Sequence, residues 1–240
     1  MQFLPIKTRP LLPPKDDLFQ IFEDFLPEVQ DGDILFITSK VVAIHQGRCV
    51  PMESVDKEEL IRQEADKRVK SNVVLEKDFY LTMKHHILIP NVWIDESNAN
   101  GHYILRPEQL KEITKQIFKF VCQRFGISNL GIIITDSTNR IGKRGVVGVG
   151  IYSYGITPVL DKRGKEDIFG RKLKFSTINV IDALSAMAVY LMGEADECTP
   201  MVIGRKIPHI VFTTDVEYET SIIPPEQDLF RPLLEVFEDV

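Results

Sequence analysis

The chain has 240 residues and a formal net charge of -6, with 44% hydrophobic and 27% charged residues. This length accommodates one large domain or two small ones, and the composition is that of a folded globular protein rather than a disordered or fibrous one. The acidic balance gives no electrostatic reason to bind nucleic acid, and no segment approaches the roughly 20 apolar residues that a membrane span requires.

The N-terminus and the cysteines both favour a protein of the cytoplasm. Prolines interrupt the first 14 residues, and no signal-peptide cleavage pattern follows them. The three cysteines (Cys49, Cys122 and Cys198) are widely spaced and form neither a Cys-x-x-Cys nor a Cys/His zinc pattern, so we expect reduced thiols. We expect a soluble cytoplasmic enzyme with no nucleic-acid or membrane partner.

The first half of the chain predicts strands and one surface helix. Residues 33–38 (DILFIT) predict a buried strand, and residues 56–70 predict a charged helix that opens at an aspartate. The run 79–94 is rich in β-branched and aromatic residues. Breaks at His85-His86 and Pro90-Asn91 divide it, which predicts short strands joined by turns.

The clearest helix begins near Pro107, which suits a first turn, and its apolar residues recur every three or four positions up to Gly126. The apolar run 130–135 (LGIIIT) then predicts a buried strand. The polar residues 136–140 follow it, so the strand is expected to deliver polar groups at its end.

The C-terminal half continues this mixture. Residues 145–152 predict a strand whose glycines indicate close backbone approach, and residues 178–192 predict a buried helix. Further strands fit 201–203 and 209–213. Local hairpins beside long helices favour a mixed α+β fold over a regular βαβ succession. No linker divides the chain, so we expect residues 1–240 to form a single unit.

Several common catalytic motifs are missing from the sequence. There is no G-x-x-x-x-G-K-[ST] loop, so a P-loop fold is not expected. The spacing of Gly145, Gly148 and Gly150 differs from a dinucleotide-binding fingerprint, which argues against a Rossmann fold. Neither a G-x-S-x-G elbow nor an H-E-x-x-H motif is present, so the sequence does not support a serine hydrolase or a zinc protease.

Acidic residues stand at the ends of three predicted elements. Asp95, Asp136 and Glu194 each fit a turn, a helix cap or a solvated loop when considered alone. Taken together with the hydroxyl of Ser137, they supply the hard oxygen ligands that Mg²⁺ or Mn²⁺ takes in phosphate-handling enzymes.

Basic residues follow Asp136 closely. Arg140, Lys143 and Arg144 lie four to eight positions beyond it and would neutralise phosphate or carboxylate oxygens if they faced the same site. A solvated basic loop explains the same pattern equally well.

These segments, in this order, resemble the coenzyme F420-0:L-glutamate ligase family, the γ-glutamyl ligases of deazaflavin cofactor synthesis. The resemblance extends over roughly residues 5 to 210 and implies a two-part, mixed-sheet α+β enzyme that forms an intertwined homodimer. It is carried by residues 31–33, 39–42, 46–48, 94–98, 134–137, 144–148, 167–171, 182, 191–194 and 200.

The resemblance also implies roles for individual residues. Asp95, Asp136, Ser137 and Glu194 would bind Mg²⁺ or Mn²⁺, and Asp136 would act in catalysis with Arg140 and Arg144. GTP or ATP would be the cosubstrate. The residues that would contact it are Arg9, Pro10, Leu11, Leu12, Ser39, Lys40, Asn98, Met192, Gly193, Glu194, Ala195, Asp196, Glu197, Cys198 and Thr199.

The chain departs from the family pattern in two places. Ile44 stands where many relatives have a lysine, and Lys40 is the residue that would supply the missing charge. Residues 195–198 replace a glycine-rich acidic loop, which changes the shape of the nucleotide pocket. A related branch of these ligases is associated with folate metabolism, so a folate-type acceptor stays open beside a deazaflavin one.

The expected reaction activates a carboxylate of the acceptor as an acyl phosphate, which the amine of L-glutamate then attacks. Two other interpretations are a non-catalytic nucleotide-binding regulatory relative and a structural α+β protein. Retention of Asp95, Asp136 and Glu194 favours the enzyme, because an inactive relative has no need for a complete ligand set.

Overall fold

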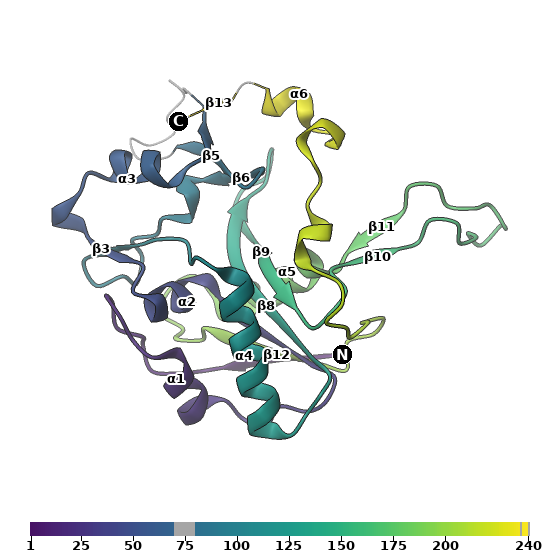
Figure 1. The fold of residues 1–240 in the computed structure, drawn as a ribbon, viewed down its shortest axis with the longest axis horizontal. Coiled ribbons are helices and arrows are strands. Elements are labelled where there is room, and N and C mark those ends of the chain that lie inside the picture. Colours follow the sequence, from purple (N-terminus) through teal and green to yellow (C-terminus); the bar gives the residue numbers. More distant parts are fainter. Residues whose placement is uncertain (70–79, 236, 240) are drawn as a thin grey trace.

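The computed structural model describes residues 1–69, 80–235 and 237–239 of the chain. A five-stranded mixed sheet lies at its centre (Figure 1). In spatial order its strands are β1 (Gln2–Ile6), β12 (Met201–Arg205), β2 (Asp33–Thr38), β8 (Leu130–Asn139) and β9 (Val146–Tyr154). Only β2 and β8 run parallel in this sheet; its other neighbours are antiparallel. The mixed sheet confirms the predicted α+β class and differs from the parallel sheet of a Rossmann fold.

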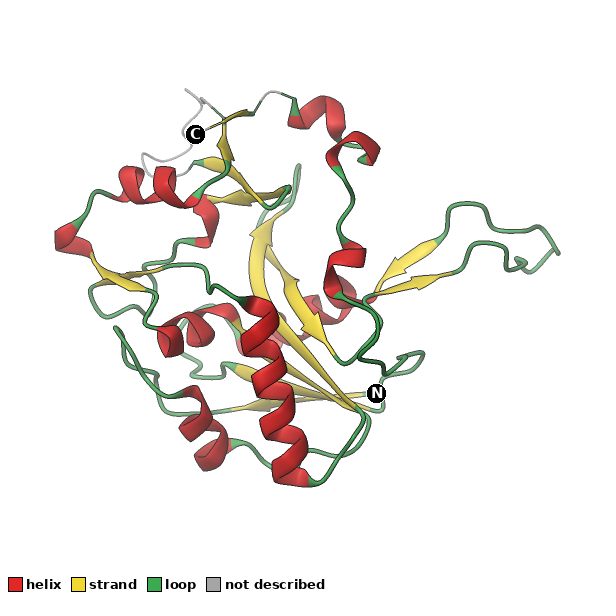
Figure 2. Ribbon diagram, in the orientation of Figure 1, coloured by secondary structure: helices red, strands yellow, loops and turns green. Residues whose placement is uncertain are grey.

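Helices cover both faces of this sheet, with α4 in front of β8 and β9 and α5 behind them (Figure 2). The helices of the described chain are α1 (Leu18–Phe25), α2 (Ser39–Gln46), α3 (Lys57–Glu64), α4 (Leu110–Phe125), α5 (Val180–Met192) and α6 (Arg231–Leu234), with 3-10 turns η1 (Met52–Ser54), η2 (Asn91–Trp93), η3 (Tyr218–Ser221) and η4 (Pro225–Gln227). Across the described residues, none of them has the length and apolar character needed to cross a membrane.

Three smaller sheets surround the centre. One has the strand order β13 (Glu238–Asp239), β4 (Lys67–Arg68), β5 (Leu81–Lys84) and β6 (Ile87–Pro90), and another pairs β3 (Cys49–Pro51) with β7 (His102–Ile104). The third pairs β10 (Val159–Asp161) with β11 (Thr177–Asn179), and the segment between these two strands projects from the body of the protein as a long arm (Figure 1).

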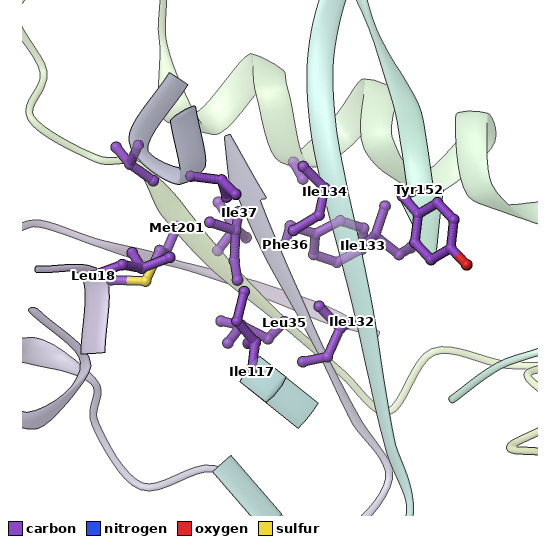
Figure 3. Packing of buried hydrophobic residues seen from close by; sticks show 14 of the residues in the cluster. Leu18, Leu35, Phe36, Ile37, Ile117, Ile132, Ile133, Ile134, Tyr152 and Met201 are labelled. Atoms are coloured by element: carbon purple, nitrogen blue, oxygen red, sulfur yellow. The ribbon is translucent and has the colours of Figure 1, made fainter. Parts of the chain in front are cut away.

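The core lies on both sides of β2 and β8 (Figure 3). Ile34, Leu35, Phe36 and Ile37 on β2 are all fully buried. Successive strand residues point to opposite faces, so an uninterrupted apolar run is stable only where helices cover both faces. Each such side chain contributes roughly 1.5–3 kcal/mol by leaving water. The core therefore fixes the two parallel strand ends at which the candidate site lies.

Two of the glycines in the predicted strand 145–152 do allow close backbone approach. A β-carbon at Gly148 would overlap Val189 of α5 and the carbonyl of Ser185, and one at Gly150 would overlap Ile181. These glycines let α5 pack directly against β9. The residues that follow the end of α5 therefore lie near Asp136 and Ser137 of β8, at the end of the sheet where the candidate site is found.

Some boundaries predicted from the sequence were wrong. The helix predicted over 56–70 ends at Glu64, because the next residues leave the helix and Lys67–Arg68 pair with β5 instead; residue 70 lies outside the described residues, as does residue 79 of the predicted strand run. The segment 209–213 forms only an isolated bridge between Phe212 and Ile156.

Two other boundaries differ as well. Pro107 precedes α4 instead of occupying its first turn. The strand predicted to end at residue 135 continues as β8 to Asn139, because β9 pairs with it along the polar stretch. The polar groups of residues 136–139 therefore lie on a strand and not beyond its end.

Candidate active site

A cavity of about 600 Å³ opens at the carboxyl ends of the parallel strands β2 and β8. Thr38 of β2 lies beside Thr135 of β8, so the residues that follow them meet. The hydroxyl of Ser39, the first residue of α2, donates a hydrogen bond to Asp136 Oδ2. This is the position in which open α/β sheets assemble ligand sites, because the chain leaves two neighbouring strands there.

Asp136 is the most perturbed acid of the cavity. A β-bulge between Ile134 and Thr135 changes the register with β9 just before this residue, and bulges redirect side chains beside functional sites. Burial raises the pKa of Asp136 to about 6, although hydrogen bonds from Ser39 and from the Ser137 backbone N–H lower it. The carboxyl group thus lacks sufficient compensation for its negative charge within the protein.

Asp95 lines the same cavity, close enough for its charge to raise the pKa of Asp136, and it is paired with a cation. Its backbone pairs with Ile104 at the end of β7, which fixes its position. Lys40 Nζ lies 2.7 Å from Asp95 Oδ2 and donates to Ser97 Oγ at 2.9 Å. Burial alone raises the pKa of Asp95, but the charge of Lys40 and hydrogen bonds from Lys40 and Ser97 outweigh it, so the pKa is lower than usual.

The segment after α5 forms the opposite wall. Gly193 ends the helix at a φ of +78°, in a conformation that brings its α-carbon against the Glu197 carboxylate. Glu197 Oε2 accepts a hydrogen bond from the Ala195 N–H at 2.8 Å, and the Asn98 amide donates to the Ala195 carbonyl at 2.7 Å. These contacts hold residues 193–199 against the Asp95 segment.

Glu194 completes the group of acids. Withdrawal from solvent raises the pKa of its carboxyl group, and a side-chain hydrogen bond with Ser137 and the charge of Lys40 act in the opposite direction. Asp95 and Glu197 add repulsion. Asp95, Asp136 and Glu194 therefore influence one another through Lys40 and Ser137, although they come from three distant parts of the chain.

The N-terminal segment supplies the remaining wall. Leu11 is buried, and Arg9 Nη2 donates to Asp16 Oδ1 at 2.9 Å, which turns the loop back on itself. The backbone N–H of Thr8 donates to the Cys198 carbonyl at 2.9 Å and links this segment to the loop after α5.

The structure brings most of the residues predicted from the sequence into this one cavity. Those that line it are Arg9, Pro10, Leu11, Ser39, Lys40, Asp95, Asn98, Asp136, Ser137, Met192, Gly193, Glu194, Ala195, Asp196, Glu197, Cys198 and Thr199. Leu12 is exposed and does not line it. Arg140 and Arg144 lie in the exposed turn between β8 and β9, also outside the cavity lining.

Trp93 was not predicted as a site residue from the sequence. Trp93 lines the cavity, and its Nε1–H donates to the Ser137 carbonyl at 3.2 Å, so the indole supports the strand that carries Asp136 and Ser137. Its place two residues before Asp95 was the available signal, but a tryptophan at the end of an apolar run is more often a core residue.

The donor set fits a hard divalent cation in chemical type but does not form a complete cage. Carboxylate and hydroxyl oxygens of Asp95, Asp136, Ser137 and Glu194 line the cavity. Nowhere in the described part of the chain do three His, Cys, Asp or Glu side chains converge tightly enough to hold a metal ion by themselves. Mg²⁺ is usually held by one or two carboxylates together with substrate phosphates, so the arrangement suits a metal that arrives with a nucleotide.

The comparison with known proteins agrees with this geometry. A family model described as F420-0:Gamma-glutamyl ligase matches residues 6–206, a span that includes every residue placed in the cavity. The chain belongs to this family.

Among individual members of this ligase family, the chain is 30% identical to the coenzyme F420:L-glutamate ligase of Methanopyrus kandleri over 244 residues, which cover 95% of this chain and 96% of the relative. It is also 30% identical to the protein of the same name from Methanocaldococcus jannaschii, over 85% of this chain and 86% of the relative. The similarity therefore spans the whole fold and not just the cavity.

Proposed function

We propose that the chain is a nucleotide- and metal-dependent γ-glutamyl ligase that joins L-glutamate to coenzyme F420-0. The chain belongs to a γ-glutamyl ligase family, and the observation that supports the proposal most directly is that one of its cavities contains both the Ser39–Asp136 and the Lys40–Asp95 contact. The names of the two relatives include coenzyme F420 and L-glutamate, which supports these two as the cofactor acceptor and the amino acid.

The amino end of α2 is suited to bind the phosphates of ATP or GTP. Ser39 and Lys40 are the first residues of this helix and both line the cavity. Free backbone N–H groups and the helix dipole favour anions at a helix N-terminus. The side chain of Lys40 adds a positive charge, whereas Ile44, one turn later, is apolar and buried.

The proposed reaction has two steps, phosphoryl transfer to the acceptor and then amide formation. A carboxylate oxygen of the acceptor attacks the terminal phosphorus, the bond to the bridging oxygen breaks, and the nucleoside diphosphate leaves. The amine of L-glutamate then attacks the acyl carbon, so that a C–N bond forms, inorganic phosphate leaves, and the amine releases its proton to solvent. The cavity residues contribute by holding the reactants together and in line.

Asp95, Asp136, Ser137 and Glu194 would hold Mg²⁺ or Mn²⁺, which supplies charge neutralisation at the phosphate oxygens. Asp136 and Glu194 are poorly compensated within the protein itself, since burial raises the pKa of both. Arg140 and Arg144 would assist as anion-orienting residues only if the exposed turn that carries them folds over the cavity.

The protruding arm supports the further proposal that the chain functions as a homodimer. The segment between β10 and β11 projects from the body of the protein (Figure 1). It carries Ile168, Phe169 and Phe175, whose exposed fractions are 92%, 89% and 89%. Apolar side chains this exposed on an extended arm are typical of a surface that another chain covers.

The direct test mixes the protein with L-glutamate, ATP or GTP, Mg²⁺ or Mn²⁺, and either coenzyme F420-0 or a folate acceptor, and measures nucleoside diphosphate release and the mass of the product. We expect a glutamylated F420-0 that requires the metal. Asp136→Asn should lose turnover, whereas Asp215→Asn, which alters an exposed aspartate outside the cavity, should keep it. If glutamate were added to the folate acceptor but not to F420-0, the acceptor in the proposal would have to be a folate. Nucleotide binding without any product would identify a regulatory relative, and full activity of metal-free protein would remove the metal from the proposal.

A further inference from the structure

A second cavity, of about 980 Å³, lies beside the first one. The turn between β5 and β6, the start of α4, the end of β9 and the C-terminal segment around η3 and η4 enclose it. Ligand sites for cofactor-sized molecules have volumes of roughly 300–1,000 Å³. This cavity is therefore large enough for a substrate much bigger than an amino acid.

Arg106 is the unusual residue of this cavity. Its Nε is buried without a hydrogen-bond partner, and no described residue forms an ion pair with its guanidinium group. Two other cations of the lining are already neutralised, Lys84 by Asp66 at 3.0 Å and Lys111 by Glu217. A partly buried guanidinium whose Nε has no partner is costly, and a bound anion would remove that cost because its oxygens accept hydrogen bonds from the planar fork. Burial also lowers the pKa of Arg106.

Part of the wall of this cavity is aromatic. The rings of Tyr152 and Tyr218 lie 5.1 Å apart between centroids, and the Tyr218 hydroxyl donates to the Gly150 carbonyl at 3.1 Å, which fixes its ring. Tyr152 stands at the margin of the core with its hydroxyl directed away from the other labelled side chains (Figure 3). Apolar groups of Ile151 and Ile222 complete this wall. Such surfaces favour a flat ring system, which packs on tyrosine faces.

Trp93 separates the two cavities. Its ring lines the first cavity and hydrogen-bonds to the Ser137 carbonyl, while the guanidinium carbon of Arg106 lies 5.5 Å from the ring centroid on the side of the second cavity. A ligand held by Arg106 would thus lie next to the strand that carries Asp136.

We infer that the second cavity binds the acceptor substrate, a planar aromatic group that bears a carboxylate or phosphate, and that Arg106 receives this anion. The inference rests on the proposed ligase function and adds the location of the acceptor. L-glutamate also carries carboxylates, but it has no ring to occupy the tyrosine wall and is small for the volume. The acceptor has both a ring system for the tyrosine wall and an anionic group for Arg106.

Equilibrium dialysis of coenzyme F420-0 against the full-length protein, without glutamate or nucleotide, tests the assignment. Arg106→Met should weaken F420-0 binding by roughly 10- to 100-fold, because it removes a charged hydrogen bond. Arg106→Lys should restore part of the affinity. The matched control is Lys111→Met, which removes a cation of the same cavity that already has a partner and should leave binding within about twofold. Nucleotide binding should be unchanged in all three variants.

Ile222→Trp provides a second test that does not depend on the stability of the Arg106 variants, because it fills the cavity and should also reduce F420-0 binding. Unchanged F420-0 affinity in folded Arg106→Met or in Ile222→Trp would overturn the assignment. The assignment would also be overturned if Arg106→Met raised the KM for glutamate and left F420-0 binding intact, since Arg106 would then hold glutamate. If the wild-type protein neither binds nor glutamylates F420-0, the proposed function itself fails, which is a different result from equal binding by wild type and variant.

Discussion

Lys40 Nζ lies 2.7 Å from Asp95 Oδ2, so the cation predicted to bind phosphate is paired with a carboxylate predicted to bind metal. The ammonium group also contacts the Ser97 carbonyl at 3.1 Å. In the protein alone, Lys40 therefore occupies a position in which it neutralises a proposed metal ligand. Nucleotide and metal must change this pairing if both are to bind.

Lys40→Met should separate the two roles. Without the ammonium group, Asp95 loses its partner, so Mn²⁺ binding to the nucleotide-free protein should become severalfold tighter. Binding of ATP and GTP should weaken by the roughly 1.5–3 kcal/mol of a charged hydrogen bond. Isothermal titration of Mn²⁺ and of each nucleotide separately measures both effects.

Lys57→Met is the matched control, because Lys57 also pairs with an acid of this region, Glu96, but does not line the cavity. It should change neither affinity appreciably. Equal nucleotide dissociation constants for wild type and Lys40→Met would exclude Lys40 from the phosphate site.

Asp136 should make the stability of the metal-free protein depend on pH. Burial raises its pKa from 3.8 to about 6, so the folded state binds the proton more tightly than the unfolded state, and stability falls as pH rises from about 4 to about 6. For these two pKa values, the free energy of unfolding contributed by Asp136 decreases by about 2 kcal/mol between pH 4.5 and pH 7.5.

Urea unfolding in the presence of a chelator, at both pH values, measures this effect. Asp136→Asn cannot titrate, so its stability relative to wild type should rise by that amount from pH 4.5 to pH 7.5. Parallel pH profiles for the two proteins would show that the carboxyl group is not perturbed.

The sequence contained the acids of the site but not their arrangement. Apolar periodicity predicted β2 and α5 closely, because β2 is buried along its length and α5 buries one face against β9. The prediction that α5 is a buried helix was only partly right, since Met187 and Tyr190 are exposed. The continuation of β8 through Asn139 depends on pairing with β9, which a polar segment does not reveal. For the same reason, the contact between Ser39 and Asp136 followed from neither residue alone. It depends on the parallel pairing of two strands that are about a hundred residues apart in the chain.

Arg106 illustrates a second limit of sequence analysis. It lies between the apolar residue Leu105 and Pro107, where an exposed arginine is the ordinary expectation. It is partly buried beside Trp93 and in a cavity that it shares with the C-terminal segment, neither of which adjoins it in sequence. Arg140 and Arg144 show the converse, since a charge cluster near a site residue lies in an exposed turn.

Gly193→Ala should damage the loop that carries Glu194. Gly193 has a φ of +78°, and an added β-carbon would overlap the Glu197 carboxylate. This φ is combined with a ψ of 177°, a region open essentially to glycine alone, and forcing another residue into it costs about 1–3 kcal/mol. Displacement of Glu197 would also break the hydrogen bond that its carboxylate accepts from the Ala195 N–H. We expect nucleotide binding to weaken at least tenfold, which corresponds to about 1.4 kcal/mol.

Gly164→Ala is the control that distinguishes the effect of backbone strain from the effect of displacing Glu197. Gly164 has a nearly identical φ of +79°, but nothing lies within 4 Å of an added β-carbon. This variant should lose stability in thermal unfolding because of its positive φ, and it should keep wild-type nucleotide binding. If both variants bind nucleotide equally, the position of Glu197 does not matter for the site.

The arm between β10 and β11 provides the last prediction, which concerns the proposed homodimer. Ile168→Asp combined with Phe169→Asp should yield a monomer at concentrations where the wild type is a dimer, because two apolar contacts become charges that a buried interface cannot accommodate. The folded body should be unaffected, since both side chains are about nine-tenths exposed in the single chain. Sedimentation velocity measures the assembly, and circular dichroism verifies the fold. Leu229→Asp alters a side chain that is 86% exposed but lies outside the arm, and this control should keep the wild-type assembly. A dimer that survives both arm substitutions would assign the interface to another surface.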